Sequence, residues 1–174
     1  MRLLPLAILL STVVINSTAL GAEPKITIKD FYGTYVGVGA TRSRGIAERD
    51  RSATLEIAPA DDGFRIAWST TIDKGSKNNK RTHAQRLTFR TSGRPGRWRA
   101  VESGDPFDKG FISWARLRGR TLFVYVFAVD PDSGELTAAI WRRTLTSKGL
   151  TVRYDRIRDA RRVRGAFAWT RRKK

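Results

Sequence analysis

Apolar and polar residues alternate with a period of two along much of the chain. The clearest case is the segment 64–72, in which every second residue is apolar or β-branched: Phe64, Ile66, Trp68, Thr70 and Ile72. Successive side chains of a β-strand point to opposite faces, so this pattern predicts a strand with one buried face and one wet face. No segment of the sequence shows the period of a long amphipathic helix.

Short clusters of Gly, Pro, Asp and Ser separate the predicted strands. They lie at 59–63, 92–96, 118–120, 130–134 and 147–149. They divide the chain into strands expected at 31–38, 53–57, 64–72, 82–91, 97–101, 111–117, 121–129, 136–145, 150–156 and 163–170. The segment 41–50 has no clear period and is compatible with a helical turn or a loop.

Strands that follow one another through hairpins form a meander, and an open meander exposes two sheet edges. Closure into a barrel removes both edges. We therefore expect an all-β fold, an up-and-down antiparallel β-barrel of about 8–10 strands. A β-sandwich is the alternative.

The strand expected at 121–129 is apolar on both faces. Val124 and Val126 lie on one face, and Phe123, Tyr125 and Phe127 lie on the other. Either another part of the chain covers the outer face or a partner does. Because large exposed apolar patches are rare, we expect cover from the N-terminal segment or from the loop 103–110.

The first 22 residues have the order of a secretory signal peptide. A positive start is followed by an apolar stretch over 3–15 and by small residues that place the cleavage site near Gly21 or Ala22. The stretch is shorter than the roughly 18 residues of a membrane-spanning helix. We expect a signal peptide at 1–22, a single β-barrel domain at 23–170 and a basic C-terminal tail at 171–174. The mature protein is then periplasmic or secreted.

Composition excludes several kinds of chemistry. The chain has no cysteine and one histidine, His83, which rules out disulfides, thiolate nucleophiles and metal sites made of several Cys or His side chains. We expect no cofactor and no metal. The carboxylates Glu102, Asp105 and Asp108 share one loop, where such residues more often form turns than catalyse. His83 is expected to be a surface residue.

Positive charge dominates the sequence, with 34 Lys and Arg against 16 Asp and Glu, a net charge of +18. Residues 74–99 hold nine basic side chains and no acid, and 153–174 hold ten basic side chains and two acids. The predicted basic patch comprises Lys74, Lys77, Lys80, Arg81, Arg171, Arg172, Lys173 and Lys174. Such a surface attracts anionic lipid or another envelope polyanion, with nucleic acid as the less favoured partner. An Arg-rich proteome would produce the same bias without function.

Candidate ligand residues combine guanidinium groups with aromatic rings. They are Arg97, Trp98, Arg99, Tyr125, Arg142, Arg153 and Arg164. We expect Arg142, Arg153 or Arg164 to pair with oxyanions of a ligand in the barrel. Trp98 between two arginines also resembles a stacking surface for single-stranded nucleic acid, but rings that fill a barrel and arginines on the opposite strand face produce the same pattern.

The segment Gly33-Thr34-Tyr35 resembles the first strand of the calycin barrels, the lipocalin and avidin class, which opens with G-x-W. Tyr35 stands where that class has Trp. The resemblance implies a lipocalin-like barrel with a central cavity, open at one end, for an apolar or amphipathic ligand. The chain also resembles a family of uncharacterised exported alphaproteobacterial proteins, which brings no established function, through residues 31–35, 63–64, 68–70, 114–116 and 143–145.

These features predict an exported, non-enzymatic protein that binds an anionic or amphipathic ligand, such as a lipid, lipopolysaccharide or another envelope polyanion. One alternative is a barrel enzyme with an Arg/Tyr/Glu site, for which Tyr35, Tyr125 and Tyr154 are candidate acids. The other alternative is a nucleic-acid-binding protein.

Signal cleavage predicts the mass of the exported protein. Intact mass spectrometry of protein from the host envelope should match a chain that begins at Ala22 or Glu23. A soluble mature protein that retains Met1 would contradict the prediction.

Overall fold

The computed structural model describes residues 25–43, 46–73, 80–108, 110–158 and 161–172, which form ten strands and one short helical turn. The elements are η1 (Ile28–Phe31), β1 (Gly33–Ser43), β2 (Ile46–Ala60), β3 (Gly63–Asp73), β4 (Lys80–Thr91), β5 (Arg97–Ala100), β6 (Ile112–Arg118), β7 (Thr121–Val129), β8 (Leu136–Thr146), β9 (Gly149–Arg158) and β10 (Arg161–Arg172). The all-β prediction is confirmed. Within these ranges, no helix is long and apolar enough to cross a membrane.

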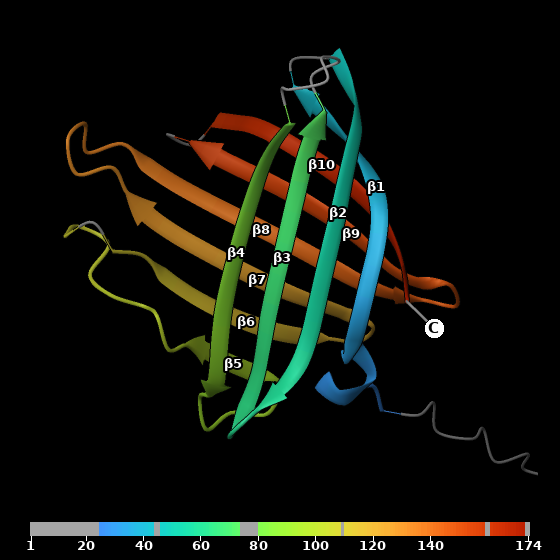
Figure 1. The fold of residues 1–174 in the computed structure, drawn as a ribbon. Helices are drawn as coiled ribbons and strands as arrows, with labels where there is room; N and C mark the ends of the chain where they lie inside the picture. The colour runs from blue at the N-terminus through green and yellow to red at the C-terminus, as the bar shows by residue number, and fades with distance from the viewer. Residues whose placement is uncertain (1–24, 44–45, 74–79, 109, 159–160, 173–174) are drawn as a thin grey trace, which may run out of the picture.

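Each strand pairs antiparallel with the next, and β1 also pairs with β10, so the meander closes into a barrel. In Figure 1, β1 to β4 cross in front of the strands that form the rear wall. The up-and-down barrel is therefore confirmed and the sandwich alternative is wrong. The helical turn or loop considered for 41–50 is also wrong in its described part, because β1 runs to Ser43 and β2 begins at Ile46. There, Thr41 pairs with both β10 and β2.

Strand register sorts the side chains into an inner and an outer set. Inward residues meet across neighbouring strands, as in Tyr35–Leu55–Trp68 and Ile57–Ile66–Leu87. The buried apolar residues belong mostly to this set, with Phe31 of η1 beside them: Phe31, Tyr35, Leu55, Ile57, Phe64, Ile66, Leu87, Phe89, Ala100, Ala115, Leu122, Val124 and Leu150. The period-two prediction for β3 is confirmed at Phe64, Ile66 and Trp68.

The turn η1 plugs the end of the barrel where β1 begins. Phe31 is fully buried, and its carbonyl accepts a 2.7 Å hydrogen bond from the buried Tyr35 hydroxyl. Asp30 holds the start of the turn, because its carboxylate accepts a 2.7 Å bond from the Thr27 amide. This end is therefore filled with apolar side chains and closed to water.

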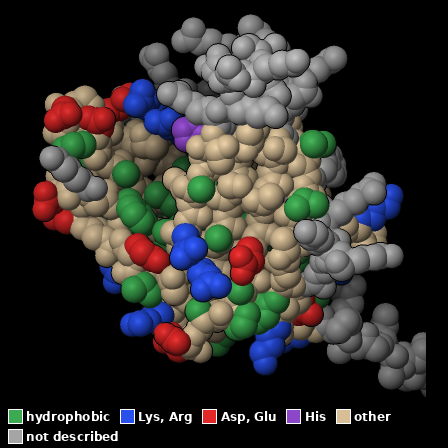
Figure 2. Space-filling view, in the orientation of Figure 1, with side chains coloured by type: hydrophobic (Ala, Val, Ile, Leu, Met, Phe, Trp, Pro, Cys, Tyr) green, Lys and Arg blue, Asp and Glu red, His purple; other side chains and the backbone are tan. Residues whose placement is uncertain are grey.

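The wall is incomplete beside β4. The short strand β5 pairs with β4 only at residues 89–91, and the Glu102 carboxylate accepts bonds of 2.9 and 3.0 Å from the amide of Thr88. From residue 87 back to the start of β4, no described strand pairs with the edge of β4 that faces away from β3. His83 and Gln85 point inward yet are exposed, and Figure 2 shows the surface hollowed beside the single histidine. Water thus reaches the barrel interior from this end.

The plug predicts a specific stability effect. Tyr35→Phe leaves the buried Phe31 carbonyl without its donor and should lower the free energy of unfolding by about 1–2 kcal/mol. Tyr125→Phe removes a hydroxyl from the outer wall and should change it by less than about 0.5 kcal/mol. Urea denaturation of both variants tests the difference, and equal effects would contradict it.

Candidate functional site

Arg143 is a buried cation inside the barrel. It lies on the inward face of β8, between Leu122 of β7 and Val152 of β9 in the strand register. Its side chain is only 1% exposed. Its Nε and Nη1 atoms are buried and have no hydrogen-bond partner. The period-two pattern of β8 produces this placement, because Trp141, Arg143 and Leu145 share one face.

An aromatic layer surrounds the guanidinium. Its central carbon lies 5.4 Å from the centroid of the Trp68 ring. The Trp68 ring is 5.4 Å from Trp141, and Trp141 is 4.8 Å from Tyr154. Trp68 belongs to β3 and Trp141 to β8, and these strands lie in the front and rear walls in Figure 1. Because their ring centroids are 5.4 Å apart, the two rings meet across the lumen. The cation–π contact compensates for part of the lost hydration of Arg143.

Burial lowers the pKa of the Arg143 guanidinium to about 9, because the apolar surroundings disfavour its charged form. The group still carries its charge at neutral pH. No carboxylate of the described chain lies within the 4.0 Å of an ion pair to it. A buried and unpaired cation is costly, and an anion with oxygen acceptors would satisfy both its charge and its free N–H groups.

The open end of the interior is lined by small and basic side chains. Arg156 faces inward opposite Ala139, and its buried Nε atom has no hydrogen-bond partner. Arg158, nearer the rim, forms a 2.8 Å ion pair with Glu135. With the inward-facing Ala53, these positions leave an interior that is basic towards the opening and apolar towards the plug.

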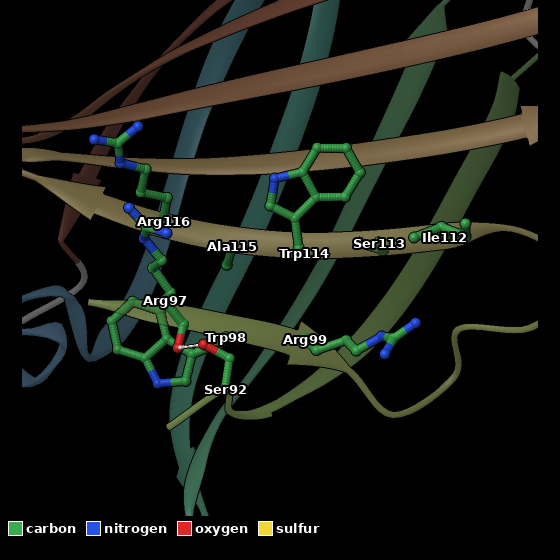
Figure 3. A pocket seen from close by; sticks show the side chains of 9 residues that line it. All are labelled: Ser92, Arg97, Trp98, Arg99, Ile112, Ser113, Trp114, Ala115 and Arg116. Atoms are coloured by element: carbon green, nitrogen blue, oxygen red, sulfur yellow. Dashed lines mark hydrogen bonds between the residues drawn. The ribbon is translucent and has the colours of Figure 1, made fainter. Parts of the chain in front are cut away.

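A second candidate site is a groove of about 450 Å³ at the junction of β5 and β6. Figure 3 shows its lining residues: Ser92, Arg97, Trp98, Arg99, Ile112, Ser113, Trp114, Ala115 and Arg116. Trp114 and Trp98 project to opposite sides of the wall in this view. The Trp114 side belongs to the outer surface, where Trp114 is 41% exposed.

The structure separates the predicted ligand residues. Arg142 and Arg153 point outward and both form ion pairs with the buried Asp155, the latter at 3.4 Å. Oxyanion pairing inside the barrel therefore does not come from these two residues. Their parity explains this, because each alternates with an inward residue of its strand.

The remaining predicted residues lie near the outer groove. Arg97 and Arg99 are exposed on β5, whereas Trp98 packs edge-on against Phe64 at 5.1 Å and helps to fill the barrel. Tyr125 points outward and stacks on Trp114 at 5.0 Å. The interpretation of Trp98 as a core ring thus fits the structure better than a stacking platform does.

Several predicted positions fall where the structure says nothing about side chains. Arg164 pairs with Arg156 in the backbone register of β10 and β9. Lys80 and Arg81 belong to β4, and Arg171 and Arg172 to β10, again as backbone only. Outside the described residues lie Lys74, Lys77, Lys173, Lys174, Gly21 and Ala22.

Several of the candidate catalytic groups have structural roles. Glu102 caps the free edge of β4, and the Asp105 carboxylate accepts a 2.9 Å bond from the amide of Phe107, as in a turn. The Tyr35 hydroxyl is engaged by the plug. Among the described residues, no group of three or more His, Asp or Glu side chains could hold a metal ion.

Sequence reasoning missed Arg143 as a site residue. Two arginines follow Trp141 in the sequence, and only the second, Arg143, lies on the same strand face as the ring. The spacing from Trp141 to Arg143 to Leu145 was the available signal, because residues two apart in a strand share a face.

Comparison with known proteins adds little. No protein-family model matches the sequence, and no curated protein matches it. The resemblance to exported alphaproteobacterial proteins therefore stays a prediction. The structure is similar to that of the S-type phycobiliprotein lyase CPES from Guillardia theta, with a TM-score of 0.37, 9% identity and coverage of 84% of this chain and 90% of that chain. At this distance the likeness carries no argument about ligand or activity.

The buried charge of Arg143 predicts an effect on the free energy of unfolding. A lowered pKa means that the folded state holds the Arg143 proton less tightly than the unfolded state, so the charge destabilises the ligand-free fold at neutral pH. Arg143→Met should raise the free energy of unfolding at pH 7 by about 1–3 kcal/mol.

Urea denaturation of delipidated protein measures this effect. The exposed Arg118 of β6 supplies the control, and Arg118→Met should stay within about 0.5 kcal/mol of wild type. A clear loss of stability in Arg143→Met would show that Arg143 is a structural cation and would contradict the prediction.

Proposed function

We propose that this protein is a non-enzymatic binding barrel for an anionic amphipathic ligand. The anionic head pairs with Arg143, and the apolar body packs against the aromatic layer of Trp68 and Trp141. One observation carries the proposal: a guanidinium that is 1% exposed has two nitrogen atoms without a hydrogen-bond partner inside a closed barrel.

The chemistry of the interior selects the class of ligand. Guanidinium N–H groups match the paired oxygens of a carboxylate or a phosphate. The rings beside Arg143 favour a hydrocarbon or planar apolar body over a fully hydrated anion. Arg156, nearer the opening, adds positive potential along the path by which an anion would enter.

The predicted export of the chain points to an envelope source for this ligand. Free fatty acids and phospholipids combine an oxyanion with an apolar chain, and both occur in cell envelopes. We therefore take dodecanoate as the probe of first choice. Dodecanol, which has the same chain without the charge, is the matched control ligand.

Tryptophan fluorescence tests the proposal, because two rings of the site report on it directly. Wild type should bind dodecanoate saturably and dodecanol far more weakly. Arg143→Met should weaken dodecanoate binding by about 30-fold or more, since it removes one partner of a buried charge pair. Arg143→Lys should recover part of the affinity, because it keeps the charge without the planar fork.

Salt dependence and a surface variant complete the test. Arg118→Met should bind dodecanoate like wild type, and raising the salt concentration should weaken wild-type binding only slightly, because buried pairs are poorly screened. Equal loss in Arg143→Met and Arg118→Met, or equal affinity for dodecanoate and dodecanol, would refute an anion site at Arg143.

A further inference from the structure

The outer wall of β5 to β9 carries three ordered rows of side chains. The strand register aligns Arg97, Arg116, Phe123, Arg142 and Arg153 in one row, and Arg99, Trp114, Tyr125, Ile140 and Asp155 in the next. The third row, on β6 to β9, is apolar and consists of Ile112, Phe127, Ala138 and Ile157. The wall thus changes from basic through aromatic to apolar across a distance of a few residues. We call this surface the outer aromatic face.

Arginines on this face differ in how their charge is balanced. Arg142 and Arg153 share the carboxylate of Asp155. Arg97, Arg99 and Arg116 are exposed and form no ion pair with a described residue. Arg97 and Arg116 also lie directly opposite each other on adjacent strands, an arrangement that is unfavourable without an anion between them. These three arginines and Trp114 line the groove of about 450 Å³.

Aromatic rings on this face stack on one another. Trp114 and Tyr125 lie 5.0 Å apart with an interplanar angle of 11°, and Tyr125 and Phe123 lie 6.1 Å apart at 9°. Tyr125 therefore has a ring on both of its faces, and Trp114 and Phe123 each contact Tyr125 with one face. The cover expected for this strand does not extend over Trp114, which remains 41% exposed.

We propose that the outer aromatic face docks on the surface of an anionic lipid bilayer. Headgroup phosphates would bind Arg97, Arg99 and Arg116 in the groove, and the ring edges with the apolar row would sit at the boundary of headgroups and acyl chains. Trp and Tyr favour that boundary, where one end of the side chain is apolar and the other wet. Arginine stems lie along apolar surface while their charged ends reach phosphate.

Two features favour a bilayer over single-stranded nucleic acid. Bases stack on successive free ring faces, and here the central ring, Tyr125, has both faces covered by Trp114 and Phe123. Nucleic acid also has no use for the apolar row of Ile112, Phe127 and Ile157, which a bilayer interface would bury. This surface is separate from the interior, so the proposal does not rest on the ligand of Arg143.

Vesicle co-sedimentation at low salt tests the docking surface. Wild type should bind vesicles of phosphatidylcholine with phosphatidylglycerol and should not bind phosphatidylcholine alone. The variant R97Q/R99Q/R116Q should lose about a hundredfold in partitioning, since each arginine near an anionic surface contributes about fivefold. The matched control R65Q/R86Q/R90Q removes the same charge from the outer side of β3 and β4 and should lose less than about threefold.

Further readouts separate the alternatives. The fluorescence of wild type should shift to the blue on anionic vesicles, and most of this shift should disappear in Trp114→Phe. R97Q/R99Q/R116Q should keep the far-UV circular dichroism spectrum and the urea midpoint of wild type, which shows that the variant is folded. Equal losses in the two triple variants would mean unspecific attraction by net charge and would overturn the proposal. It would also be overturned if the first variant lost binding of a dT20 oligonucleotide but kept binding to vesicles.

Discussion

Pairing between β1 and β10 is the constraint on which the rest of the structure depends. It closes the meander and gives every residue of the wall an inside or an outside. On β8, Arg142 and Arg143 are neighbours in sequence but lie on opposite sides of the wall. Arg142 meets Asp155 outside, and Arg143 meets Trp68 inside. Without closure, the sheet face that carries Arg143 would be open to water.

The lining of the barrel changes from apolar to basic along its length. Near the plug, Phe31, Phe64 and Phe89 are fully buried, and burial of large apolar side chains of this kind contributes about 1.5–3 kcal/mol each. Further along, small and basic side chains replace them, and the fold tolerates an unpaired guanidinium. An arrangement that costs stability and persists in a folded protein is typical of a site built for a ligand.

The sequence predicted the barrel well, because local signals carry it. Gly and Pro clusters mark the hairpins, and period-two patterning marks strands such as β3. The sequence pattern could not predict which residues of β8 and β9 face the barrel interior. In β8, both Trp141–Arg143 and Ile140–Arg142 mix an apolar residue with an arginine, so neither parity is excluded by composition. Only the pairing with Leu122 and Val152 decides it.

The outer aromatic face could not be predicted from the residue pattern of any single strand. Arg97 and Arg116 become neighbours only through the register of β5 and β6, and Trp114 meets Tyr125 only through β6 and β7. The sequence did show that β7 is apolar on both faces, and this clue correctly marked the strand as unusual. What covers its outer face depends on non-local contacts that a single sequence does not contain.

Native mass spectrometry of protein purified gently from its own host tests the central claim most directly. We predict that wild type carries a bound anionic amphiphile and that Arg143→Met, purified in parallel, does not. An adduct of the same mass and occupancy in both proteins would contradict an anion site at Arg143, as would wild type without any adduct that also fails to take up dodecanoate.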